Sequence, residues 1–108
     1  MAQDFRNEVA RSQGTTAAAI LTGGDYDAII GIRCTNILTS TIKVDVYVVK
    51  GGNNYYFAKD ASIPPGGSLE LIQGGSKIVL ENGDVLWHDC DTANGLDIWV
   101  SYIDTISS

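Results

Sequence analysis

The sequence has little of the chemistry that catalysis requires. Its 108 residues include one histidine and two cysteines, and no G-x-S-x-G, H-E-x-x-H, P-loop or G-x-G-x-x-G motif occurs. His88 and Cys90 stand two residues apart on an expected strand, so their side chains share a face but lie roughly 6–7 Å apart. That distance is too long for a nucleophile–base hydrogen bond. We therefore expect no enzyme, no catalytic residue and no cofactor.

Basic residues are absent from the C-terminal part of the chain. Residues 78–108 contain no Lys or Arg, and their acids contribute to a formal net charge of −6. Such a surface repels phosphate backbones, so we expect no nucleic-acid binding. No apolar run approaches the roughly 18 residues of a membrane-spanning helix, so we expect no membrane partner either.

The two cysteines, Cys34 and Cys90, are expected to be free and buried. The opening residues, MAQDFRNEVARSQG, lack the apolar segment of a signal peptide, and structural disulfides are rare in reducing compartments. The cysteine spacing is close to that of the immunoglobulin disulfide. However, no Trp lies on the strand that follows Cys34, and His88 stands where that family has a tyrosine.

What the sequence does contain is alternation with a period of two, together with many turn signals. In TIKVDVYVVK, for example, Ile42, Val44, Val46 and Val48 fall on one face. Glycine, proline and Asn-Gly pairs separate short apolar segments at roughly 8–12 residues. The expected strands lie at about 15–22, 26–38, 42–50, 53–61, 68–72, 77–80, 85–92 and 96–104. We predict an all-β fold, a single antiparallel β-sandwich of about eight strands, jelly-roll or immunoglobulin-like, over residues 15–108.

Two segments carry more specific expectations. In YDAIIGIRCTNIL, Gly31 indicates a β-bulge, and the predicted core set is Ile30, Ile32 and Cys34. Residues 1–14 are read as a short N-terminal arm, in which Asp4 caps a helix too short to be stable alone. This segment is either an arm that orders against another molecule or a frayed terminus.

The last two strands are predicted to form a hairpin through Asn94-Gly95. One face of this hairpin carries an obvious core set: Val85, Trp87, Ile98, Val100 and Tyr102. The opposite face is also partly apolar, which indicates a second covering surface. Together with the apolar residues of the arm, it gives the predicted interface, namely Phe5, Val9, Leu86, Trp99 and Ile103.

The turn between these strands also gives the only metal-site candidate. Asp89, Asp91, Asn94 and Asp97 supply oxygen ligands that suit a hard cation such as calcium. Their spacing departs from that of a calcium-binding loop, and the hairpin turn explains Asn94-Gly95 without a metal. We expect no metal ion here.

Nearly the whole chain resembles one family. The segments FRNEVARSQGTTAAAILTGGDYDAIIGIRCTNI, VDVYVVKGGNNYYFAKDASIPPGG, SLELIQGG, SKIVLENGDV and DIWVSYID resemble small virion structural proteins of tailed bacteriophages, especially phages of marine cyanobacteria. The resemblance implies a β-sandwich that decorates or builds a particle and has no catalytic residues.

These observations favour a non-enzymatic component of a tailed-phage virion, assembled in the host cytoplasm. It would decorate the capsid exterior or build the neck, tail or baseplate. Its expected partners are copies of itself, as a homo-oligomer, and other virion proteins of the capsid or tail. The alternative is a carbohydrate- or receptor-binding sandwich for host attachment, with exposed aromatics from among Tyr47, Tyr55, Tyr56 and Trp99.

Overall fold

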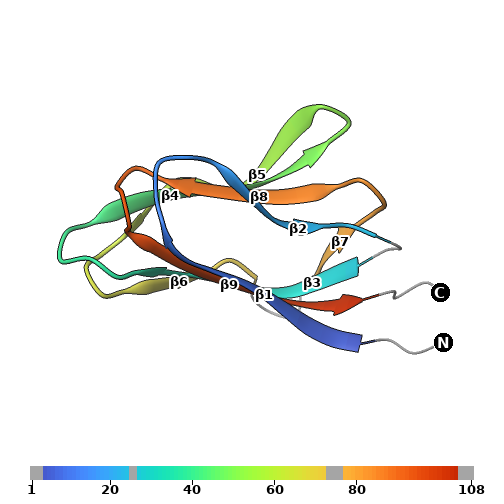
Figure 1. The fold of residues 1–108 in the computed structure, drawn as a ribbon, viewed down its shortest axis with the longest axis horizontal. Helices are drawn as coiled ribbons and strands as arrows, with labels where there is room; N and C mark the ends of the chain where they lie inside the picture. The colour runs from blue at the N-terminus through green and yellow to red at the C-terminus, as the bar shows by residue number, and fades with distance from the viewer. Residues whose placement is uncertain (1–3, 25–26, 73–76, 105–108) are drawn as a thin grey trace.

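The computed structural model of the chain describes residues 4–24, 27–72 and 77–104. These residues form an all-β protein with two antiparallel sheets packed face to face, so the predicted β-sandwich is confirmed (Figure 1). The strands are β1 (Asp4–Gln13), β2 (Ala18–Thr22), β3 (Asp27–Asn36), β4 (Ile42–Lys50), β5 (Asn53–Ile63), β6 (Ser68–Glu70), β7 (Ile78–Leu80), β8 (Val85–Cys90) and β9 (Leu96–Asp104). All eight expected strands are present, and β1 is an addition.

The two sheets have different strand orders. Sheet A, the lower layer in Figure 1, has the order β1-β9-β3-β6, with β7 also paired to β3. Sheet B, the upper layer, has the order β2-β8-β4-β5. The chain passes from one sheet to the other after β1, β2, β3, β5, β7 and β8, so most strands that follow each other in sequence lie in opposite layers. The edge strands of the sandwich on one side are therefore β1 and β2.

The core lies between the sheets and follows the period-two pattern. Ile42, Val44, Val46 and Val48 of β4 are all buried, as predicted from their alternation. They face Ile98, Val100 and Tyr102 of β9, which are also buried. Burial of these β-branched and aromatic side chains is the main source of stability of such a sandwich.

Strand β3 contains the predicted bulge, and the bulge changes which of its residues face the core. Its register with β9 slips between Ile29 and Gly31, so one residue is inserted there. Ile29 is fully buried and Ile30 only partly, whereas Ile32 and Cys34 are buried as expected. The prediction of Ile30 was wrong because a bulge interrupts the alternation that strict counting assumes.

The predicted hairpin of β8 and β9 does not form. β8 pairs with β2 and β4 in sheet B, whereas β9 pairs with β1 and β3 in sheet A. Asn94 takes a left-handed conformation (φ 57°) as its turn signal implies, but this turn carries the chain between the layers. The faces of β8 are consequently reversed: Leu86, His88 and Cys90 are buried in the core, and Trp87 lies on the outer face of the sheet.

The N-terminal segment is a strand, not the helix considered from the sequence. β1 pairs with β9 in antiparallel register from Asp4 opposite Asp104 to Gln13 opposite Leu96, with a bulge between Ala10 and Gln13. The ladder to β9 satisfies backbone groups that a helix of this length would not hold stably by itself. Residues 4–13 therefore order against the rest of their own chain.

Among the described residues, no helix is long and apolar enough to cross a membrane.

Candidate functional site

The outer face of sheet A carries the candidate site. Residues directly opposite each other in an antiparallel sheet point to the same face, so the register defines rows of neighbouring side chains. One row runs across the sheet from Val9 to Trp99, Arg33 and Glu70. A second row runs from Phe5 through Ile103 and Ala28 to Val79, and all four of its residues are apolar.

Large apolar side chains on this face are exposed to solvent. The exposed fraction is 76% for Phe5, 55% for Val9 and 52% for Trp99. Taking about 200 Å² for the side chain of Phe and about 250 Å² for that of Trp, Phe5 and Trp99 alone expose roughly 280 Å² of aromatic surface. Contiguous apolar patches of a few hundred Å² on soluble proteins commonly mark interaction sites.

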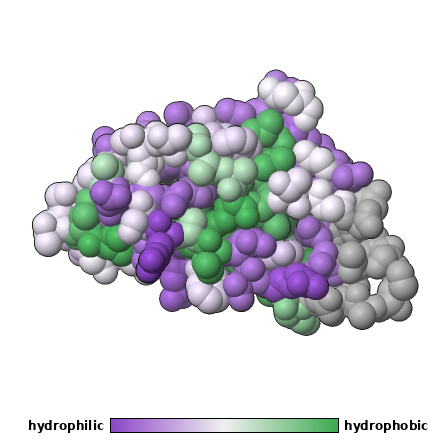
Figure 2. Space-filling model, viewed as in Figure 1, coloured by the Kyte–Doolittle hydropathy of each residue, from purple (hydrophilic) through white to green (hydrophobic). Residues whose placement is uncertain are grey.

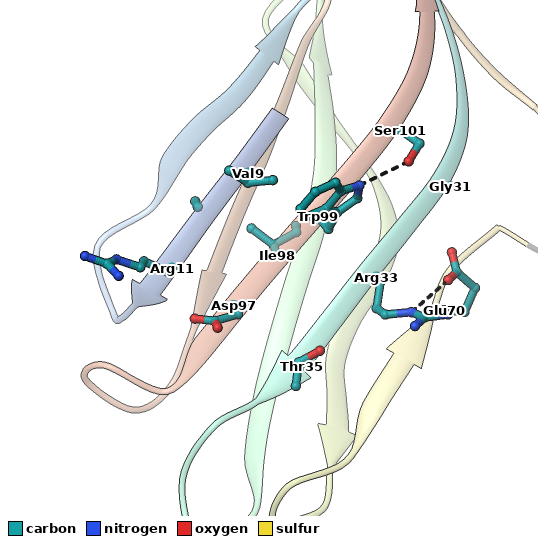
Figure 3. Close-up of a pocket in the computed structure, with 11 residues that line it drawn as sticks. Val9, Arg11, Gly31, Arg33, Thr35, Glu70, Asp97, Ile98, Trp99 and Ser101 are labelled. Atoms are coloured by element: carbon teal, nitrogen blue, oxygen red, sulfur yellow. Dashed lines mark hydrogen bonds and ion pairs between the residues drawn. The ribbon is translucent and has the colours of Figure 1, made fainter. Parts of the chain in front are cut away.

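A groove of ≈ 810 Å³ runs along this face beside Trp99. Figure 3 shows the Trp99 ring across its centre, with the indole Nε1 donating a hydrogen bond to Ser101 Oγ at 3.2 Å. That bond fixes the ring orientation. Next to it, Gly31 has no side chain, and a Cβ placed there would make only ordinary contacts with Glu70 and Ser101. The missing side chain keeps the groove open.

Opposite charges alternate along the groove. The Arg33 guanidinium pairs with Glu70 at 3.3 Å (Nε to Oε1), and the other oxygen of Glu70 accepts a hydrogen bond from the backbone N–H of Ile32 at 3.1 Å. At the opposite end, Asp97 Oδ1 accepts a hydrogen bond from the backbone N–H of Ser12 at 2.9 Å, and Arg11 points away from Trp99 (Figure 3). Two arginines and two acids make the groove locally neutral on a chain of net charge −6.

Four of the five predicted interface residues lie together on this face. Phe5 stands opposite Ile103, and Val9 stands opposite Trp99, in the β1–β9 ladder. Leu86 was predicted wrongly: it is fully buried in the core, because β8 belongs to sheet B and turns its even-numbered residues inward. The sequence also gave no indication of Arg33 and Glu70, which meet only through the pairing of β3 with β6.

The candidate cation ligands are not brought together. Asp89 belongs to β8 in sheet B and Asp97 to β9 in sheet A. Asp91 is occupied by hydrogen bonds from the Lys43 backbone N–H (3.0 Å) and the Thr92 hydroxyl (3.0 Å). Within residues 4–24, 27–72 and 77–104, no group of three or more His, Cys, Asp or Glu side chains is placed to hold a metal ion.

The outer face of sheet B carries an aromatic row that includes two of the expected platform residues, Tyr47 and Tyr56, although Tyr47 is only 9% exposed and so is not the exposed aromatic that the sequence led us to expect. Trp87 of β8 stands opposite Tyr47 of β4, which stands opposite Tyr56 of β5. The rings of Tyr47 and Tyr56 are 5.0 Å apart between centroids, and Lys59 Nζ lies 4.9 Å from the centre of the Tyr56 ring. Of the proposed aromatic platform, Tyr55 lies along a different groove beside Val48, and Trp99 lies on the other sheet.

A carboxyl pair adjoins this aromatic row. Asp45 and Asp89 stand directly opposite each other in the β4–β8 ladder. Partial burial of Asp89, followed by its hydrogen bond and charge repulsion with Asp45, raises its pKa to about 6. Asp45 Oδ1 also accepts a hydrogen bond from the backbone N–H of Asp60 at 2.7 Å. These oxygens are fixed hydrogen-bonding groups at the edge of the aromatic row.

The thiols and the histidine lie in the core. Cys34 and Cys90 are both free and buried, as predicted. Burial raises the pKa of Cys34 to about 12, so its thiol is fully protonated near neutral pH. Cys90 Sγ donates a hydrogen bond to the Thr92 carbonyl at 3.0 Å. The His88 side chain is 1% exposed, and burial lowers its pKa.

No protein-family model and no curated protein sequence matches the chain.

Proposed function

We propose that the chain is a non-enzymatic structural component of a tailed-phage virion, an exterior accessory protein that contacts its neighbours through the outer face of sheet A. The observation that carries this proposal is the gathering of Phe5, Val9, Trp99 and Ile103 on one exposed face. The resemblance of the sequence to tailed-phage virion proteins supplies the kind of particle. The capsid surface and the neck, tail or baseplate are the places that such a protein occupies.

The size and charge of this face suit contact with another protein subunit. The three long strands β1, β9 and β3, about 4.8 Å apart and about ten residues long, present roughly 490 Å² in projection, and the short β6 and β7 raise this to roughly 600 Å². That area approaches the roughly 800 Å² that each partner contributes to a stable interface. The groove is locally neutral, so an acidic protein can approach it without the repulsion that the rest of the surface would produce.

The experiment compares two matched tryptophan variants. Particles that lack the protein are incubated with purified wild type, Trp99→Ala or Trp87→Ala, and bound protein is measured after sedimentation. We expect Trp99→Ala to weaken attachment by roughly thirtyfold or more, as at an interface hot spot, and Trp87→Ala to attach as the wild type does. Absence of the protein from purified virions, or equal attachment of both variants, would reject the proposal.

A second candidate function rests on the outer face of sheet B. Trp87 and Tyr56 are accessible on either side of the nearly buried Tyr47, and with the adjoining Asp45–Asp89 pair they combine aromatic rings with fixed hydrogen-bonding groups. This combination suits a carbohydrate, whose apolar ring face stacks on aromatic side chains while its hydroxyl groups bond to carboxyl oxygens. In this case the protein would attach to host glycans.

The same two variants separate the candidates. A glycan array, followed by calorimetry with any glycan that binds, should show loss of binding for Trp87→Ala and unchanged binding for Trp99→Ala. A chain that binds no glycan on the array, or that binds one equally well without Trp87, excludes a glycan site on this face.

A further inference from the structure

β1 offers an open strand edge to solvent. It pairs with β9 along one side, and no strand of the described residues pairs with its other side. Residues 5–9 are all exposed. The backbone donors and acceptors of an edge strand are a template for pairing with another strand. Natural sheets usually guard such an edge with charged side chains, and β1 carries two of opposite sign near its middle, Arg6 and Glu8.

The sequence of β1 is complementary to itself about Asn7. Arg6 and Glu8 stand one residue on either side of Asn7, with opposite charges. Phe5 and Val9 stand two residues on either side, and both are apolar. When this strand is laid antiparallel against a copy of itself, opposite charges meet and apolar side chains meet.

We propose that two copies of the chain pair through β1, antiparallel and with two-fold symmetry about Asn7. Arg6 then stands opposite Glu8 of the second copy, and Phe5 opposite Val9 of the second copy. Each pair occurs twice, as a two-fold axis requires. Two residues at equal distances on either side of Asn7 are an even number of positions apart, so their backbone N–H and C=O groups point to the same side of the strand. The groups that point away from β9 in one copy therefore meet the groups that point away from β9 in the other.

This pairing joins the two copies of sheet A into one continuous sheet with a shared outer face. The row of Arg33, Trp99 and Val9 continues directly into Phe5 and Ile103 of the second copy. Phe5, which is 76% exposed in the isolated chain, gains an apolar cross-strand neighbour. The groove beside Trp99 is thereby repeated on either side of the two-fold axis.

The charges of β1 and the surface beside it both fit a second copy. Two chains of net charge −6 repel each other, so they associate where opposite charges meet locally, and the two Arg6–Glu8 pairs provide this. Arg6 is held on sheet A by its ion pair with Asp104 at 3.1 Å. Figure 2 has the same viewpoint as Figure 1, in which β1 lies at the front. It shows a hydrophobic band that crosses this face from one layer of the sandwich to the other. A β1-paired copy would adjoin this band.

The inference deepens the proposed virion contact, but its test needs only the purified chain. Sedimentation velocity of the full-length wild type should show a concentration-dependent dimer. Arg6→Glu and Glu8→Arg each place like charges opposite one another twice. Each change should therefore weaken dimerisation by roughly tenfold or more. An equimolar mixture of the two variants places acids opposite arginines again, so it should restore the dimer as a heterodimer.

Lys59→Glu on β5 is the matched control, since it makes the same charge reversal on the exposed edge strand of the other sheet. It should dimerise as the wild type does. A wild type that remains monomeric at every concentration, single variants that dimerise normally, or a mixture that stays monomeric would each overturn the inference. The particle experiment with Trp99→Ala is read independently, so a monomeric chain that still loads through sheet A would reject the β1 pairing and retain the virion role.

Discussion

Replacing His88 with leucine should stabilise the protein. His88 is 1% exposed, and neither of its ring nitrogens has a hydrogen-bond partner among the described residues. It points into the core from β8, opposite Ala18 and Val46 on the two neighbouring strands. A buried polar group without a partner costs about 1–3 kcal/mol of folding free energy, whereas leucine places apolar atoms in a similar volume. Imperfect shape complementarity of leucine places the gain toward the lower end of this range.

The expected increase in the free energy of unfolding is about 1–3 kcal/mol at pH 7. For a chain of this length, 1 kcal/mol raises the Tm by about 4 °C, so the Tm should rise by about 4–12 °C. Urea unfolding followed by circular dichroism measures the change directly. His88→Gln is the control, because it keeps an unpaired polar group in the core and should give no stabilisation.

The pH dependence provides a second measurement. Burial lowers the pKa of His88 in the folded state below its usual value near 6.5. Below pH 6.5 the unfolded chain therefore takes up a proton that the folded chain does not, and the wild type loses up to about 1.4 kcal/mol per pH unit. The advantage of His88→Leu should thus grow between pH 7 and pH 5. A variant no more stable than the wild type, with the same pH dependence, would show that the His88 ring is hydrogen-bonded in the folded state and titrates there as it does in the unfolded chain.

Three further predictions follow from buried or paired polar groups. Asn36→Ala should lower the free energy of unfolding in urea by about 3 kcal/mol. The fully buried Asn36 amide donates to the carbonyls of Ser40, Ile63 and Pro64 and accepts from the Leu38 N–H, and alanine makes none of these bonds. The control, Asn53→Ala on the surface, should cost under about 0.5 kcal/mol. Asp89→Asn should stabilise the protein by about 1 kcal/mol at pH 7, because the raised pKa of Asp89 means that its charged form is disfavoured in the folded state. This gain should vanish by pH 4, where the Asp89 carboxyl is protonated in the folded chain. A gain that does not change with pH in urea unfolding would contradict the raised pKa of Asp89. A thiol reagent at pH 8 should label neither Cys34 nor Cys90 until the chain unfolds, since both are buried, and rapid labelling of the native protein would show that the core opens readily.

The fold class could be predicted from the sequence because it depends on local signals. Alternation in TIKVDVYVVK determines which residues of β4 share a face, and glycines and prolines interrupt the apolar segments between strands. The candidate contact face was also partly predictable. Once Ile98 and Val100 are assigned to the core, alternation turns Trp99 outward, and the structure confirms this exposure.

The pairing of strands depended on the tertiary structure. Alternation shows which residues of β8 lie together but not which face is inward, and both faces of that strand carry large apolar residues. The choice was made by β2 and β4, which are distant in sequence and bury Leu86, His88 and Cys90. The Asn94-Gly95 turn fixes a local backbone conformation, and it fits a passage between sheets as well as a hairpin.

The N-terminal segment and the rows on sheet A were decided in the same way. Phe5 and Val9 have a spacing that fits one face of a short helix as well as one face of a strand, so local sequence leaves the choice open. β9, more than eighty residues away, supplies the ladder that makes the segment a strand and sets Val9 beside Trp99. Long-range backbone pairing thus decided which exposed side chains became neighbours, because hydrogen bonds between strands act over distances in sequence that no local pattern encodes.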